Sequence, residues 1–141
     1  MKSRIVLIED NAYEADILNA SLAQLNYHYQ ITYFSNPLQA YKYLHATSEK
    51  IFLIISDMHM PKLNGLELRK MITDNKKLRT KSIPFIIFSN TASPNEIREA
   101  YTNGVHGYFQ KPEKIEEAIK MLDIIIKYWQ RCKQPDKLDD N

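Results

Sequence analysis

The chain has 141 residues, a net charge of +2 and a single cysteine, Cys132. These values indicate one domain in a reducing compartment and exclude a disulfide scaffold or a cysteine-ligated zinc site. The charge is too small to favour a nucleic-acid partner, and no apolar run is long enough for a transmembrane helix or a secretory signal. We therefore expect a cytoplasmic globular protein with no nucleic-acid or membrane partner.

Short apolar runs recur along the chain and predict the strands of a parallel sheet. The runs at 5–8, 51–55 and 83–88 are continuous, which is typical of strands that helices cover on both faces. The run at 29–34 alternates polar and apolar residues and predicts an edge strand with one wetter face. The fifth and shortest strand is expected at 107–110.

Amphipathic patterns between these runs predict the first three helices. Residues 12–25 and 66–72 each place apolar side chains on one face. Asn36 and Pro37 suit the N-cap and first position of a helix that continues through Leu44.

The last two helices carry boundary signals. The segment Ser93-Pro94-Asn95-Glu96 predicts a capping box, and Gly104 predicts the end of that helix. The final helix follows Pro112 and is apolar on one face from Ile115 to Trp129. A strand and a helix thus alternate five times, which predicts an α/β fold with a doubly wound parallel sheet and helices on both faces.

These five units extend to about residue 131. We therefore expect one domain over residues 1–132 and a polar tail over 133–141. No room is left for a DNA-binding or catalytic output domain, so the function is expected to depend on contact with another protein.

Polar residues directly follow the predicted strands: Glu9, Asp10, Asp57, Ser89 and Lys111. Each alone is most often a turn or cap residue, but the carboxyl ends of parallel strands meet at one edge, where ligands bind in such sheets. Three carboxylates together need a cation, and oxygen ligands suit Mg²⁺ or Mn²⁺. Asp57 could accept a phosphoryl group as a nucleophile, with Lys111 and Ser89 contacting the phosphoryl oxygens.

Four motifs stand out at these positions: Ile8-Glu9-Asp10, Ser56-Asp57-Met58-His59-Met60-Pro61 with Gly65, Phe88-Ser89 and Lys111-Pro112. Together they resemble the receiver domain of two-component response regulators, similar to the single-domain chemotaxis type. The resemblance covers residues 3 to about 130 and implies a flavodoxin-like sheet with strand order 2-1-3-4-5.

The resemblance implies a role for each matched position. Glu9 and Asp10 would hold the metal together with Asp57, which is the implied phosphoacceptor. His59 would offer its backbone carbonyl to the metal, and Lys111 would contact the phosphoryl group. The implied phosphoryl donor is a sensor histidine kinase or a phosphotransfer protein. The implied function is that of a signalling switch rather than a metabolic enzyme, and the protein could also catalyse its own phosphorylation from small donors and its own dephosphorylation.

The family also implies a conformational switch. Ser89 would turn toward the phosphoryl group, and Tyr108 would rotate inward into the space it leaves. The Lys111–Pro112 peptide bond is expected to be cis. The surface formed by the fourth helix, fifth strand and fifth helix would then change and contact a downstream protein.

Three residues are expected to tune the lifetime of the phosphorylated state: His59, Asn90 and Thr91. The family usually has Ala or Gly at the position of Asn90. We hypothesise that the larger side chain shades phosphorylated Asp57 from attacking water.

A narrower resemblance concerns the segments 108–112 and 126–129. They look like stand-alone receivers partnered with bacterial phytochrome-type histidine kinases, which implies a homodimer through the same switch surface. An exposed edge at Tyr128 and Trp129 would favour a dimer or partner surface, whereas the alternative is that Trp129 covers the base of the core.

Three alternatives remain at this stage. A haloacid dehalogenase-type phosphatase needs an aspartate where this chain has His59, together with a cap insertion. A flavin-binding flavodoxin-like module is disfavoured because Glu9 and Asp10 would repel its phosphate. A degenerate receiver would bind partners without being phosphorylated, although every essential position is filled here.

Overall fold

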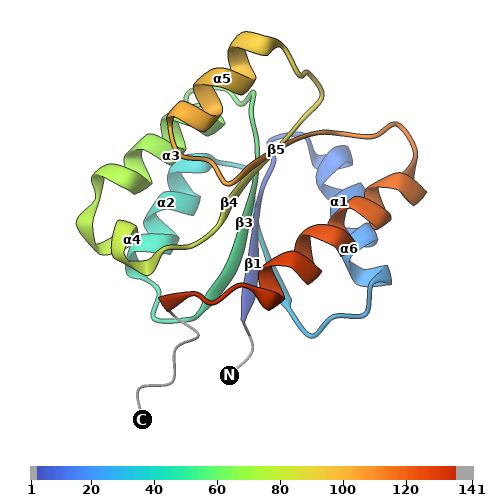
Figure 1. The fold of residues 1–141 in the computed structure, drawn as a ribbon, viewed down its shortest axis with the longest axis horizontal. Helices are drawn as coiled ribbons and strands as arrows, with labels where there is room; N and C mark the ends of the chain where they lie inside the picture. The colour runs from blue at the N-terminus through green and yellow to red at the C-terminus, as the bar shows by residue number, and fades with distance from the viewer. Residues whose placement is uncertain (1–2, 136–141) are drawn as a thin grey trace.

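The computed structural model describes residues 3–135, which form a central sheet covered by helices on both faces (Figure 1). The five strands are β1 (Arg4–Ile8), β2 (Gln30–Phe34), β3 (Ile51–Asp57), β4 (Phe85–Ser89) and β5 (Gly107–Gln110). All neighbouring strands pair in parallel, in the order β2-β1-β3-β4-β5. The predicted doubly wound sheet and its strand order are therefore confirmed.

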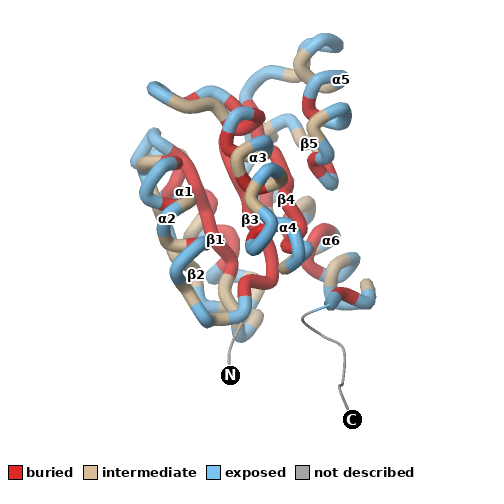
Figure 2. Tube along the Cα trace, turned by 90° about the vertical axis from the view of Figure 1, so that its left-hand side faces the viewer, coloured by how far each residue is buried: buried red, intermediate tan, exposed pale blue. Residues whose placement is uncertain are grey.

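The strand burial follows from position in the sheet. Every residue of β3 and β4 is buried, in keeping with their continuous apolar runs. Strand β2 lies at the edge as predicted, with every residue exposed or partly exposed, but its burial does not alternate strictly. Figure 2 shows the buried strands running through the middle of the molecule between helices with exposed outer faces.

The helices divide into two layers (Figure 1). One layer contains α1 (Ala12–Gln24) and α6 (Ile115–Arg131), and the other contains α2 (Pro37–Ala46), α3 (Gly65–Asp74), α4 (Lys76–Lys81) and α5 (Pro94–Thr102). Each layer packs on its own buried cluster of apolar side chains. Burial of these two faces supplies the main stabilisation of the fold.

The short helix α4 is the main departure from the expected five strand–helix units. Asn75 both ends α3 and caps α4, accepting a hydrogen bond from Leu78 N at 3.0 Å. Leu78 is the only buried residue of this helix, so the segment has too little apolar periodicity to be recognised. The fourth and fifth helices of the sequence prediction are thus α5 and α6.

The caps confirm most of the predicted helix boundaries. Asn36 Oδ1 accepts a hydrogen bond from Leu38 N at 2.9 Å, and Gly104 has a φ of +81° just after α5. Ser93 caps α5 by accepting from Glu96 N at 3.2 Å. The predicted capping box is only half formed, because the Glu96 carboxylate turns instead to side chains near the end of the sheet.

The C-terminal region is partly described. Gln134 is buried in the described part of the predicted tail, and residues 136–141 lie outside the described residues. Within residues 3–135, no helix is long and apolar enough to span a membrane.

Candidate phosphoryl-acceptor site

The predicted acidic residues come together at the carboxyl ends of β1 and β3. One carboxylate oxygen each of Glu9, Asp10 and Asp57 lies within 4.8 Å of the others. Glu9 and Asp57 are buried and Asp10 is exposed. Residues at the ends of adjacent strands are brought together by the parallel register, in which Ile8 pairs with Ser56.

The donor set of this cluster fits a divalent cation. Burial raises the pKa of Glu9 to about 8, and although Lys111 opposes this shift, the adjacent Asp57 adds to it. Such a group of crowded carboxylates is stabilised when a hard cation binds between them, and oxygen donors are the ligands of Mg²⁺ and Mn²⁺. The residues that would hold the ion are therefore Glu9, Asp10 and Asp57.

The backbone around Asp57 is held closely. Met58 N donates to Asp57 Oδ1 at 2.8 Å, and Gly65 N donates to Met58 O at 2.9 Å. A Cβ atom at Gly65 would lie only 2.5 Å from Asp57 O. The first position of α3 must therefore be glycine for this loop to pass under the strand end.

Lys111 extends from the end of β5 into the acidic cluster. Its Nζ lies 2.5 Å from Glu9 Oε1, 3.2 Å from Glu14 Oε2 and 3.5 Å from Asp57 Oδ1. Burial opposes the charge on Lys111, but the hydrogen bond to Glu9 and the charges of Asp57 and the other carboxylates raise its pKa. The ammonium group is thus charged and within reach of the predicted phosphoacceptor.

The Lys111–Pro112 bond corrects one prediction. No described peptide bond is cis, so the expected cis proline is wrong for this structure. The intrinsic preference of an X–Pro bond for the trans isomer is about 0.5–1 kcal/mol. Here Lys111 N donates to Ser89 O at 2.7 Å while its side chain reaches the acidic cluster.

The predicted switch residues lie in one hydrogen-bonded network. Ser89 is buried, and its Oγ accepts from Thr91 N at 3.2 Å. The single proton of the Tyr108 hydroxyl is shared between Thr91 O at 2.8 Å and Glu96 Oε2 at 3.2 Å. His59 Nε2 lies 3.2 Å from both Thr91 Oγ1 and Glu96 Oε1.

Glu96 is the centre of this network and was not among the predicted site residues. Burial opposes its ionisation, but hydrogen bonds from Thr91 and Tyr108 and the nearby His59 lower the pKa of Glu96 overall. The sequence indicated Glu96 only as half of a capping box, because its position three residues after Ser93 matches that motif.

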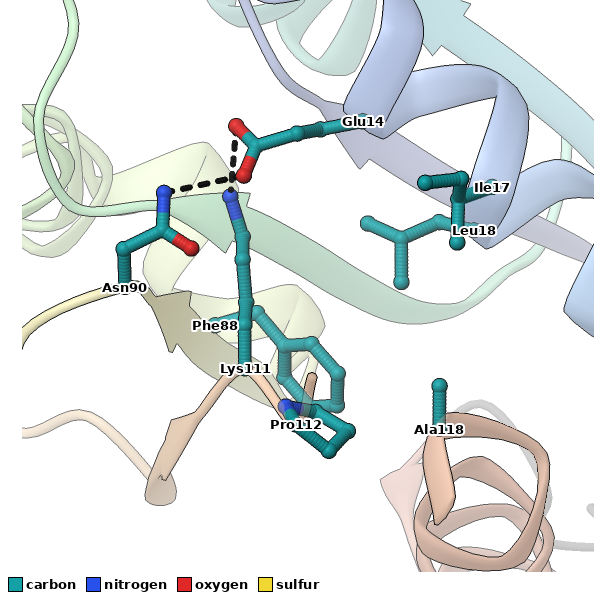
Figure 3. Close-up of a pocket in the computed structure, with 8 residues that line it drawn as sticks. All are labelled: Glu14, Ile17, Leu18, Phe88, Asn90, Lys111, Pro112 and Ala118. Atoms are coloured by element: carbon teal, nitrogen blue, oxygen red, sulfur yellow. Dashed lines mark hydrogen bonds and ion pairs between the residues drawn. The ribbon is translucent and has the colours of Figure 1, made fainter. Parts of the chain in front are cut away.

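The predicted tuning residue Asn90 is exposed, and its amide contacts α1 rather than another predicted residue. Asn90 Nδ2 donates to Glu14 Oε1 at 2.9 Å, and both lie with Lys111 along one rim of a cavity of about 80 Å³ (Figure 3). Glu14 was also missed by sequence reasoning. The available signal was its position one turn after Asp10, at the same end of the sheet.

The chain also matches a family of known proteins. Residues 5–123 match the response regulator receiver domain, and the chain belongs to that family. Receiver domains are phosphoacceptor switches of two-component signalling rather than classical enzymes; they bind a divalent metal and interact with sensor histidine kinases and phosphotransfer proteins.

Two relatives of known sequence align over most of their length. A probable methanogenesis regulatory protein, FilR2, of Methanothrix harundinacea is 27% identical, over 89% of this chain and 82% of its own. The two-component response regulator ORR13 of Oryza sativa subsp. japonica is 29% identical, over 89% of this chain and 100% of its own.

Solved structures show the same fold. The phosphorylated cyanobacterial phytochrome response regulator RcpA has a TM-score of 0.84 at 22% identity, covering 96% of this chain and 99% of its own. The response regulator RPA3017, from red light signalling of R. palustris, has a TM-score of 0.83 at 21% identity, covering 94% and 98%. The Mn²⁺-bound form of the response regulator Rcp1 has a TM-score of 0.80 at 22% identity, covering 94% and 99%.

Proposed function

We propose that the protein accepts a phosphoryl group on Asp57, in a reaction that requires Mg²⁺ or Mn²⁺, from a histidine kinase or a phosphotransfer protein. The observation that carries this proposal is the approach of Lys111 Nζ to within 3.5 Å of Asp57 Oδ1, beside the acidic cluster. A nucleophilic carboxylate with a cation site and an ammonium group nearby combines attack on phosphorus with neutralisation of phosphoryl charge.

Each side chain of the site then has a defined part. Glu9, Asp10 and Asp57 would hold the divalent ion, with the His59 carbonyl as its further predicted ligand, and the ion would neutralise phosphoryl charge. Asp57 attacks phosphorus while Lys111 stays protonated and binds a phosphoryl oxygen. The Ser89 hydroxyl, buried at the end of β4, supplies a hydrogen-bond donor to another oxygen.

The response is a shift between two arrangements of Ser89 and Tyr108. When Ser89 turns to the phosphoryl group, its hydrogen bond with Thr91 N is lost, and the loop that also binds the Tyr108 hydroxyl must readjust. Phosphorylation therefore alters the surface between α5 and β5. Asn90 and Thr91 belong to this loop and His59 contacts it, which supports the proposal that these three residues tune the lifetime of the phosphorylated form.

The surface at α6 supports a partner contact or a homodimer. Ile124 and Tyr128 are 67% and 61% exposed, while Trp129 is half-buried against His106 and Tyr128. We infer that this edge, with α5 and β5, contacts a second copy or a downstream protein, as for stand-alone receivers of phytochrome-type kinases. Ile124→Glu should abolish self-association in analytical ultracentrifugation, and a wild-type protein that is already monomeric would contradict the dimer.

Acetyl phosphate and intact-mass measurement test the phosphoacceptor directly. With Mg²⁺, the protein should gain one phosphoryl group, and Asp57→Asn or removal of the metal by a chelator should abolish the gain. Asp74→Asn, an exposed aspartate at the end of α3, is the matched control and should be phosphorylated normally. No adduct with either small donors or a phosphorylated histidine kinase would support a phosphorylation-independent binding module instead.

A further inference from the structure

Glu14 provides a second carboxylate contact to Lys111 from helix α1. Its Oε2 lies 3.2 Å from Lys111 Nζ, and its Oε1 accepts the hydrogen bond from Asn90 Nδ2 at 2.9 Å. Figure 3 shows Asn90 and Lys111 both directed at this carboxylate. The contact joins α1 to the segments that follow β4 and β5, three elements far apart in the sequence.

The local structure holds Glu14 in place. Its backbone N–H donates to the Asn11 side chain at 3.0 Å, which caps α1, and its side chain is only 25% exposed. Asn90 fixes the orientation of the carboxylate by binding one oxygen, which leaves the other directed at Lys111. The side chain of Lys111 is still more buried, at 10% exposure, so water screens this pair less than a surface ion pair.

Lys111 is therefore divided among carboxylates, and Asp57 has the longest of the three distances. A phosphoryl group on Asp57 would have to compete with the carboxylates of Glu9 and Glu14 for this ammonium group. A divalent cation in the acidic cluster would neutralise part of the charge of Glu9 and Asp57, but Glu14 is not a member of that cluster. Glu14 would therefore still compete for Lys111 when the cation is bound to the cluster.

We propose that Glu14, oriented by Asn90, is a positioning residue that retains Lys111 and thereby slows phosphorylation of Asp57. The proposal rests on the proposed phosphoacceptor function. In transfer from acetyl phosphate, a carboxylate oxygen of Asp57 bonds to phosphorus as the bond between phosphorus and the acetate oxygen breaks. The bonding electron pair leaves with acetate, and Lys111 remains protonated throughout.

The test compares phosphorylation rates from acetyl phosphate at saturating Mg²⁺, followed by intact mass. Glu14→Gln keeps the side-chain shape and removes the charge, so the rate should rise about two- to fivefold, the effect of a partly exposed ion pair. Asn90→Ala should give a smaller increase. The double variant should be no faster than Glu14→Gln alone, because both residues act through one contact.

Asp16→Asn is the matched control, since it removes one exposed negative charge from the same helix. It should phosphorylate at the wild-type rate, and all variants should remain folded, with a cooperative thermal unfolding transition. Equal acceleration by Asp16→Asn would reduce the effect to net charge and overturn the proposal. If wild type is phosphorylated normally and Glu14→Gln reacts at the same rate, the proposed role of Glu14 is wrong but the phosphoacceptor function stands. If neither wild type nor any variant forms an adduct, both the phosphoacceptor function and the role of Glu14 are wrong.

Discussion

The carboxylate of Glu96 accepts a hydrogen bond from the Tyr108 hydroxyl at 3.2 Å, which ties strand β5 to helix α5. The same carboxylate contacts Thr91 and His59, residues of the two loops beside Asp57. A change at the phosphoryl site can therefore reach the surface of α5 through a small set of direct contacts. This relationship gives Glu96 a place in the switch that the sequence motifs alone do not assign.

Replacement of Glu96 by alanine should release Tyr108. Burial, followed by the contacts with Glu96, raises the pKa of the Tyr108 hydroxyl, because a carboxylate that accepts its hydrogen bond stabilises the protonated form. Glu96→Ala should therefore lower the pKa of Tyr108, measured by NMR of labelled tyrosine and assigned with Tyr108→Phe. Glu99→Ala, an exposed change on the same helix, should leave it unchanged, and an equal pKa in Glu96→Ala would contradict the contact.

The side chain of Asn90 should protect the phosphorylated form. If it shades Asp57 from water, Asn90→Ala should shorten the half-life of the phosphoryl group by on the order of two- to fivefold, or less than about 1 kcal/mol in barrier height. The decay is measured after rapid removal of the phosphoryl donor. Identical decay in wild type and variant would dismiss the shading hypothesis without affecting the forward-rate prediction for Glu14.

Substitution of Gly65 by alanine should damage both stability and the site. The added Cβ would meet Asp57 O at 2.5 Å and Ile87 Cδ1 at 2.9 Å, so the backbone of the phosphoacceptor must shift. We expect a loss of about 1–3 kcal/mol in the free energy of unfolding, typical of overpacking, and slower phosphorylation.

Gly104→Ala separates these two effects. Gly104 has a positive φ, but a Cβ there would meet only the flexible Arg69 side chain at 3.6 Å. The strained backbone should cost about 1 kcal/mol of stability without altering the phosphorylation rate. Urea unfolding and intact-mass kinetics check both variants, and a normal rate in Gly65→Ala would argue against close coupling of that loop to Asp57.

His106 should make stability depend on pH. Partial burial and the positive charge of Arg69 lower the pKa of His106, and its Nδ1 accepts from Phe85 N at 3.0 Å, which requires the unprotonated ring atom. The unfolded chain therefore takes up this proton first as the pH falls. The contribution of neutral His106 to the free energy of unfolding is therefore fully present above about pH 6.5, and it is lost as the pH falls through the pKa of His106 in the folded state.

His106→Asn removes the titration but retains a hydrogen-bond acceptor. Between about pH 7.5 and 5, the free energy of unfolding of wild type should fall more than that of the variant. Urea unfolding at several pH values measures the difference. Parallel pH profiles would show that the His106 proton does not contribute.

The residue pattern along the chain is enough to define the sheet and the composition of the site. Continuous apolar runs predict buried parallel strands because helices cover both of their faces, and the run at 29–34 predicts the edge strand correctly. The polar residues after those runs have to meet, because parallel strands end at one edge of the sheet. The meeting of Glu9, Asp57 and Lys111 therefore follows from their positions after the strands.

The contacts that cross between elements depend on tertiary packing instead. Glu14 on α1 contacts Lys111, and the Glu96 carboxylate contacts Tyr108 instead of completing its capping box. In both cases the partner is distant in sequence, so local residue spacing does not reveal it. The short helix α4 contributes a single buried residue, Leu78, to the core, so its packing is visible only in the tertiary structure. The hydrophobic periodicity of the sequence indicates which face of a helix or strand is buried. The partner of each polar side chain depends instead on how the helices and strands pack together.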